Sequence, residues 1–216
     1  IVRFEFSTSQ AYIIEFGNNY CRFIKDRAQI VSGTPVELAT TYTTAELFDL
    51  KFAQSADILY VVHPDHPPRK ISRTSDTAWS ITDITFSDGP FLNTNVTTTT
   101  LGLSTTTGTV TVTASAVTGI NDDAGFASTD VGRQIRWKDA AGDWTFLTIT
   151  VFTSTTVVTA VIDGPDASAT TATINWRLGV WSATTGYPAA ITFHQNRLAF
   201  AGRSEERRVG RESRIG

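Results

Sequence analysis

Residues 50–73, which read LKFAQSADILYVVHPDHPPRKISR, decide the predicted fold. Within them, 58–62 is a continuous run of β-branched, aliphatic and aromatic side chains, which is typical of a strand buried on both faces. A tight turn at 55–57 separates this run from a shorter strand pattern before it. Three prolines, which cannot donate a hydrogen bond to a neighbouring strand, mark a bend after it, and an extended pattern resumes at 69–73. The segment therefore predicts an antiparallel meander of three strands.

Residues 191–202, ITFHQNRLAFAG, repeat part of this pattern near the end of the chain. In both places an aromatic residue and a glutamine precede a polar turn and an apolar strand. The comparison pairs Phe52 and Gln54 with Phe193 and Gln195. Repeated hairpins predict a fold built from repeated β-units, such as the blades of a propeller.

Composition and charge are those of a globular chain. The 216 residues are 41% hydrophobic and 18% charged, which suits one or two folded domains. The net charge is −3 and there is no basic stripe, which argues against a protein that reads nucleic-acid sequence. The single Cys21 excludes an internal disulfide. No apolar run approaches the roughly 18 residues of a membrane-spanning helix, so no membrane span is expected.

Changes in composition divide the chain into four parts. Residues 1–92 form a predicted N-terminal β body that contains the propeller-type meander, and 183–202 return to this body with the second hairpin. Between them, 93–182 are rich in Thr, Val and Trp and predict a small, barrel-like all-β insert. The predicted fold class is therefore all-β, with a partial β-propeller or β-sheet body interrupted by a small β-barrel-like insert.

Three smaller segments need separate interpretation. Residues 94–118 fit either a flexible linker or short strands, and alternating Thr and Val favour strands. One helical turn is expected at 43–48, where a threonine hydroxyl can cap the first amides. The Arg- and Glu-rich residues 203–216 resemble a translated sequencing adapter and are expected to be an artefact, with a genuine charged segment as the alternative.

The chain also lacks Met and begins inside a strand pattern, so we expect a fragment of a longer protein.

Histidines and paired carboxylates are the candidates for chemistry. The segment from His63 to His66 offers metal-binding side chains, but its prolines and the lack of a second ligand cluster favour a polar turn. The pair Asp122 and Asp123 and the segment 163–166 resemble acid–base pairs that act on sugars, but aspartate is common in such turns for backbone reasons alone. No GxSxG elbow, GxGxxG motif or phosphate loop is present. We therefore predict no catalytic, metal-binding or cofactor-binding residues, no cofactor and no enzyme activity.

The aromatic and basic residues of 93–182 allow two interpretations. Trp137, Trp144 and Trp176 either fill the core of a small barrel or form a face on which sugar rings stack, and the core interpretation is favoured because aromatic burial dominates small domains. Arg133 and Arg136 are expected at strand edges.

Three segments resemble, in the same order, the tail nozzle proteins of short-tailed phages and their prophages, also called tail tubular protein B. They are FSTSQAYIIEFGNNYCRFIKD at 6–26, the meander at 50–73 and FHQNRLAFAG at 193–202. Two further segments, FASTDVGRQIR at 126–136 and INWRLGVWS at 174–182, resemble the small FCCH-type β-domain of ubiquitin-activating enzymes. That second resemblance implies a fold only, because fold similarity does not transfer chemistry.

The first resemblance implies a structural protein of the virion tail. It implies self-association into a ring, a hexamer in the full-length protein, that contacts the tail adaptor protein and surrounds the channel through which DNA leaves. It also implies assembly in the bacterial host cytoplasm and passage of DNA without tight binding. The alternatives are a carbohydrate- or receptor-binding β-module of a tail and, less favoured, a polysaccharide-degrading tail enzyme.

Overall fold

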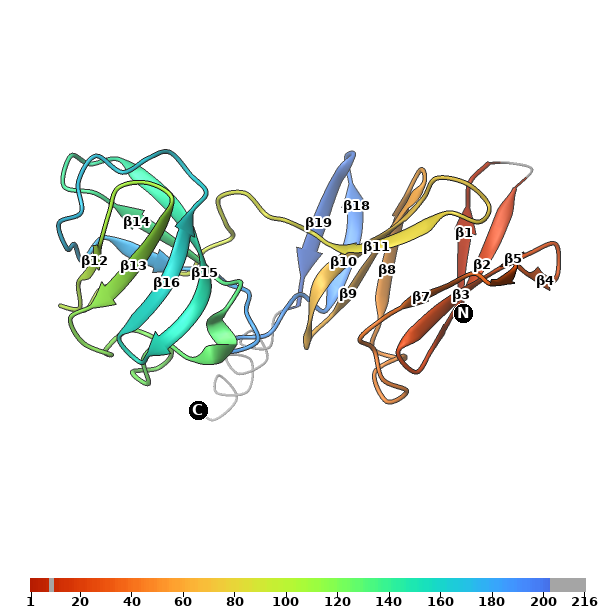
Figure 1. Ribbon diagram of the computed structural model, residues 1–216, viewed down its shortest axis with the longest axis horizontal. Coiled ribbons are helices and arrows are strands. Elements are labelled where there is room, and N and C mark those ends of the chain that lie inside the picture. Colours follow the sequence, from red (N-terminus) through yellow and green to blue (C-terminus); the bar gives the residue numbers. More distant parts are fainter. Residues whose placement is uncertain (8–9, 203–216) are drawn as a thin grey trace, which may run out of the picture. The chain divides into compact units, whose positions relative to one another are not determined.

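The computed structural model describes residues 1–7 and 10–202 (Figure 1). The chain is nearly all β, with 48% strand and 2% helix, which confirms the predicted fold class. It divides into two compact units. The body comprises Ile1–Ile84 together with residues 187–202, and the insert comprises Thr85–Gly186. The interpretation of 203–216 as an artefact falls outside the described residues.

The first sheet of the body is built from hairpins. β2 ends at Gly17 and β3 begins at Tyr20, with Asn19 at a φ of 62° in the turn between them. β1 pairs with β2, while β4 and β7 both pair with β3, and the short β5 and β6 form a separate hairpin. The strands are β1 Val2–Glu5, β2 Ala11–Gly17, β3 Tyr20–Lys25, β4 Ala28–Gln29, β5 Val31–Ser32, β6 Thr34–Pro35 and β7 Glu37–Ala39.

The predicted meander forms the second sheet of the body. Its order is β11-β10-β9-β8, the four-stranded antiparallel arrangement of a propeller blade. β9 is central, as its apolar run predicts, and Leu59 and Val61 are buried. Pro67 and Pro68 lie within β10 rather than before it, at a shift of register against β9 where missing amide donors are tolerated. The strands are β8 Lys51–Ser55, β9 Ile58–His63, β10 His66–Arg73 and β11 Trp79–Asp83.

One apolar core joins these two sheets. The ring of Trp79 stacks on Phe23 at a centroid distance of 4.0 Å and meets Phe4 edge-on at 5.1 Å. Leu59, Ile71 and the aromatic residues of β1 and β2 belong to the same buried cluster. The meander is therefore held by the first sheet on one face.

The second hairpin packs on the opposite side of β9. It consists of β18 Ala190–His194 and β19 Arg197–Ala201, and Phe193 contacts Tyr60 edge-on at 5.8 Å. The hairpin itself is as predicted, but the residue pairing is wrong. Gln54 lies within β8 opposite Leu59, whereas Gln195 lies in the two-residue loop. The error arose because a shift of two residues keeps every side chain on the same face of a strand, so the pattern does not distinguish the two registers.

The insert is a single six-stranded antiparallel sheet that curls into a half-barrel (Figure 1). Its order is β12-β13-β16-β15-β14-β17. The Thr-Val alternation of Thr109–Ala114 forms a strand rather than a linker, with Val110, Val112 and Ala114 buried. The strands are β12 Leu101–Leu103, β13 Thr109–Ala114, β14 Gln134–Lys138, β15 Trp144–Ser154, β16 Val157–Ile162 and β17 Trp176–Leu178.

Two of the three tryptophans fill the core of the insert. Trp137 and Trp176 are buried, and their indole N–H groups donate to the carbonyls of Leu101 at 2.8 Å and Thr99 at 3.0 Å. Each ring thus buries a large apolar area and satisfies its one polar atom. Trp144 is only partly buried, because it lies on the opposite face of β15 from the buried Leu147.

The helical turn expected at 43–48 is not formed. Consecutive turns replace it, and the only helix among the described residues is a short 3-10 turn at Ser128–Asp130. Glu46 donates its amide to the Thr43 carbonyl, and Asp49 donates to the Glu46 carbonyl, both at 3.0 Å. These are bonds between residues three apart, so each turn closes on itself without continuing as an α-helix.

We predict that the insert folds without the body, because its buried cluster draws only on residues of the insert. Residues before 93 should contribute to its stability, since Leu92 donates to the carbonyl of Leu178 at 2.8 Å and the side chain of Gln134 bonds to Phe86 and Gly89. Residues 85–186 should give a dispersed amide NMR spectrum and melt at a higher temperature than residues 93–182. A random-coil spectrum from residues 85–186 would contradict this prediction.

Candidate functional site

The histidine turn brings together side chains that are distant in sequence. His63 ends β9 and His66 begins β10. With Glu46, from the turns before β8, they form a group whose potential ligand atoms all lie within 4.8 Å of one another. Sequence reasoning placed a simple polar turn here and missed Glu46, because no spacing rule links a carboxylate to a histidine 20 residues later.

Hydrogen bonds and burial set the charges of this cluster. The backbone amide of Thr43 donates to Glu46, and this bond, with further ones from the Thr43 hydroxyl and His66, lowers the pKa of Glu46 to about 2. Burial lowers the pKa of His63, and the charge of His66 acts in the same direction. The cluster at neutral pH therefore holds a carboxylate beside a neutral, buried imidazole.

The acidic residues considered in the sequence bond to neighbouring groups of the insert. Asp122 and Asp123 have φ values of 54° and 69°, and the carboxylate of Asp123 accepts from the Gly119 amide at 2.7 Å. Asp163 accepts from the Thr148 hydroxyl at 2.6 Å. The Asp123 contact matches the backbone role that favours aspartate in turns, whereas Asp163 bonds to a side chain of β15.

Arg133 is buried, which corrects its expected position at a strand edge. Its side chain is 1% exposed and pairs with the fully buried Asp130 at 3.0 Å. It also donates to the carbonyl of Gly179 at 2.7 Å and to Asn121 at 2.6 Å. A buried ion pair needs such additional bonds to offset its desolvation, so this group is a structural element of the insert.

A basic patch surrounds Trp144 on the outer face of the insert sheet. The charged groups of Arg136, Lys138 and Arg177 lie 5.1, 5.8 and 5.4 Å from the centre of a Trp144 ring. Asp88 lies 3.2 Å from Arg136. Sequence reasoning missed this grouping, which forms only when β14 pairs with both β15 and β17.

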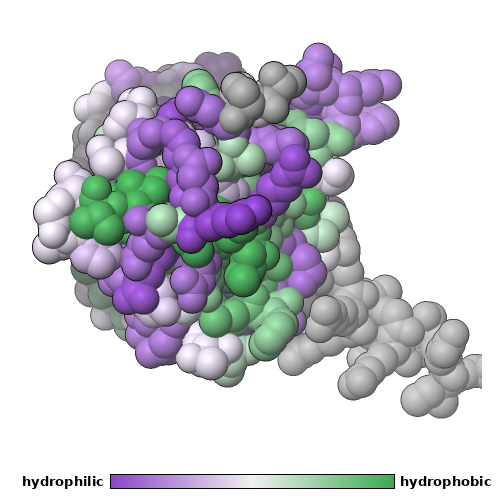
Figure 2. Space-filling view, turned by 90° about the vertical axis from the view of Figure 1, so that its right-hand side faces the viewer, coloured by the Kyte–Doolittle hydropathy of each residue, from purple (hydrophilic) through white to green (hydrophobic). Residues whose placement is uncertain are grey.

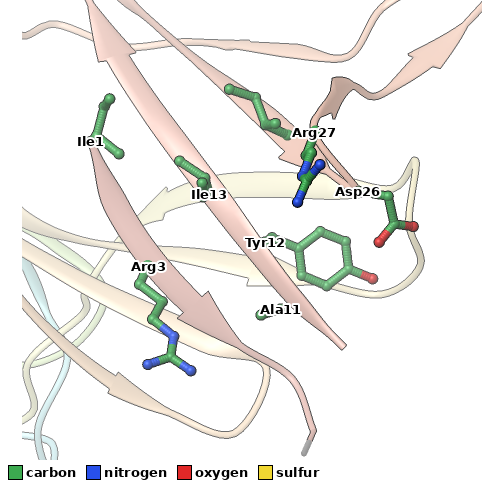
Figure 3. A pocket seen from close by; sticks show the side chains of 8 residues that line it. Ile1, Arg3, Ala11, Tyr12, Ile13, Asp26 and Arg27 are labelled. Carbon is green, nitrogen blue, oxygen red and sulfur yellow. The ribbon is translucent and has the colours of Figure 1, made fainter. Parts of the chain in front are cut away.

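A pocket of about 540 Å³ lies on the first sheet of the body (Figure 3). Arg3, Ile13 and Ile24 of its lining are direct cross-strand neighbours on β1, β2 and β3. Arg3 pairs with Glu5 rather than with another lining residue. The pocket is therefore a hollow on one sheet face, and its lining residues do not bring a nucleophile and a base together. It is lined by Ile1, Arg3, Ala11, Tyr12, Ile13, Ile24, Asp26 and Arg27.

The surface on this side of the body mixes apolar and polar groups. Figure 2 shows hydrophobic areas that hydrophilic side chains interrupt. Ile1, Phe6, Ile13 and Val31 are large hydrophobic residues that remain exposed in this part of the chain. Within residues 1–7 and 10–202, no helix has the length and hydropathy needed to cross a membrane.

Comparison with known proteins gives no assignment of family. The chain matches no protein-family model, and no curated protein matches its sequence significantly.

Proposed function

We propose that this chain is a structural component of a short-tailed phage tail, part of the nozzle ring around the DNA exit channel. The observation that carries the proposal is the architecture of the body. A blade-like meander is followed, after the insert, by a second hairpin that packs on it through Phe193 and Tyr60. The three segments that resemble nozzle proteins supply strands of the first sheet, the meander and the second hairpin of this body.

The roles of the polar groups support a structural function. The carboxylates considered for catalysis accept from a turn amide and a threonine hydroxyl, and the arginine of the buried Asp130–Arg133 pair donates to Gly179 and Asn121. Two of the three tryptophans considered for sugar stacking lie in the core. These side chains serve the stability of the sheets, as expected of a protein that acts by assembly.

The body offers sheet edges for that assembly. β11 ends the strand order of the meander sheet and pairs only with β10 among the described strands, so it is an edge strand. Open edges are sites where further strands add, from the same protein or from a neighbour. In the proposed role, such contacts and those with the tail adaptor protein build the ring, and the protein resides in the virion tail.

The DNA flanking this coding region provides the test. Sequencing of the neighbouring genes should show portal, adaptor or internal virion genes. A setting among capsule-depolymerase or metabolic genes, without virion genes, would contradict the proposal. A glycan array probed with the insert would then address the carbohydrate-binding alternative.

We predict that residues 1–202 have negligible affinity for duplex DNA at physiological salt. They carry 13 Lys and Arg against 18 Asp and Glu, a net charge of −5. Each phosphate that a protein neutralises adds salt-dependent affinity, and tight binding would stall a moving DNA. A gel-shift titration at about 150 mM salt should show no complex at micromolar protein.

The basic patch around Trp144 provides the control for this measurement. Its three cations are too few for the many phosphate contacts that tight duplex binding requires. If a complex forms and the double variant Arg136→Ala/Arg177→Ala abolishes it, the patch grips DNA and the passive-channel interpretation is wrong.

A further inference from the structure

The cluster of Glu46, His63 and His66 has the donor types and spacing of a metal site. Nε2 of His66 lies 3.0 Å from Oε1 of Glu46. Two ligand atoms about 2.0–2.1 Å from a tetrahedral ion lie roughly 3.3 Å apart, so this pair can share an ion with almost no movement. The donor atoms of all three residues lie within 4.8 Å of one another, so the widest pair must approach by no more than about 1.5 Å to reach that spacing.

Neighbouring groups already fix two of the donors. The Thr43 amide and hydroxyl hold the other carboxylate oxygen of Glu46 at 2.7 and 2.9 Å, which leaves Oε1 directed at His66. Nδ1 of His66 lies 3.3 Å from the Thr41 hydroxyl. An outer partner on one ring nitrogen orients a histidine so that the other nitrogen can bind a metal.

His63 presents a buried nitrogen that needs a partner. The residue is 2% exposed, and its Nε2 makes no hydrogen bond in the part of the chain that the structure describes. Its Nδ1 accepts the Asp65 amide at 3.1 Å, so the neutral ring carries its proton on Nε2. Metal binding at Nε2 moves that proton to Nδ1 and releases the amide of Asp65, an exposed residue, to water. The ion thus satisfies a buried polar atom at the cost of one hydrogen bond in an exposed turn.

We propose that Glu46, His63 and His66 bind a first-row divalent metal ion, for which Zn²⁺ is the best fit. Two imidazoles and a carboxylate are ligands that zinc accepts, and water would fill the fourth position of a tetrahedral site. The ion would link the turns before β8 to the β9–β10 hairpin. Such a link is independent of the proposed role in a phage tail.

Zinc titration of the untagged chain tests the site. After EDTA treatment and desalting, calorimetry should show one Zn²⁺ bound per chain, and Co²⁺ should develop visible ligand-field bands. His66→Ala and Glu46→Gln should each weaken binding at least as much as loss of an outer-shell partner does, about 10- to 100-fold. Circular dichroism in EDTA establishes that each variant remains folded, and His66→Gln replaces His66→Ala if that variant is unfolded.

The third histidine of the chain provides the matched control. His194 ends β18 and is not part of the cluster, so His194→Ala should leave affinity and stoichiometry unchanged. Cys21 does not compete, because burial raises the pKa of its thiol to about 12 and keeps it protonated. The proposal is overturned if the wild-type chain binds no ion, if both cluster variants bind as the wild type does, or if only His194→Ala loses binding.

Discussion

Leu59→Asp is expected to unfold the body. Leu59 is 1% exposed in the central strand β9, where it lies between Gln54 of β8 and Ile71 of β10. Truncating a buried leucine costs about 2–5 kcal/mol, and an unpaired buried carboxylate adds several more. Because the total stability of a domain is only about 5–15 kcal/mol, this single change should remove most or all of it.

Amide NMR spectra of the full chain measure this effect for each unit. Signals of the body should collapse in Leu59→Asp, while those of the insert should persist. Ser80→Asp provides the control, because Ser80 is an exposed residue of the edge strand β11 in the same sheet. A surface change of this kind should shift stability by no more than about 0.5 kcal/mol. If Leu59→Asp melts as the wild-type chain does, β9 is not the core strand.

Local patterns account for what the sequence predicted well. Strand periodicity and turn residues act over a few neighbours, so the meander and the Thr-Val strand of the insert could be predicted directly. The segment at 43–48 shows the limit of such patterns. Its threonine and glutamate resemble a helix cap, but Glu46 also bonds to His66, a contact that local sequence does not contain.

The features of the candidate sites were missed because they depend on contacts between distant residues. The group around Trp144 draws on three strands, and its basic residues look unrelated until β14 lies between β15 and β17. Arg133 and Arg136 are three residues apart and of one type, yet the first is buried and the second is partly exposed. Their shared residue type therefore led to the same expected position for both. The difference in their burial depends on the path of the loop before β14.

Arg133→Met should destabilise the insert by about 3–5 kcal/mol, the usual result of removing one partner of a buried ion pair. It leaves the carboxylate of Asp130 buried and without its cation, and it removes the donors to Gly179 and Asn121. Methionine keeps much of the apolar stem of the side chain, so the loss reports mainly on charge and hydrogen bonds. Native-state hydrogen exchange of the amides in β14, β15 and β16 measures the free energy of opening of the insert alone.

The double variant Asp130→Asn/Arg133→Met separates the ion pair from its surroundings. Removing both charges should cost less than the sum of the two single changes, because each single change leaves a buried charge unpaired and the double variant leaves none. Arg136→Met, in the strand β14 that follows Arg133, is the matched control. Its pair with Asp88 is partly exposed, so its loss should cost no more than about 1 kcal/mol. If Arg133→Met and Arg136→Met destabilise equally, or if the two changes at 130 and 133 are additive, the buried pair does not act as a unit that holds the loops of the insert.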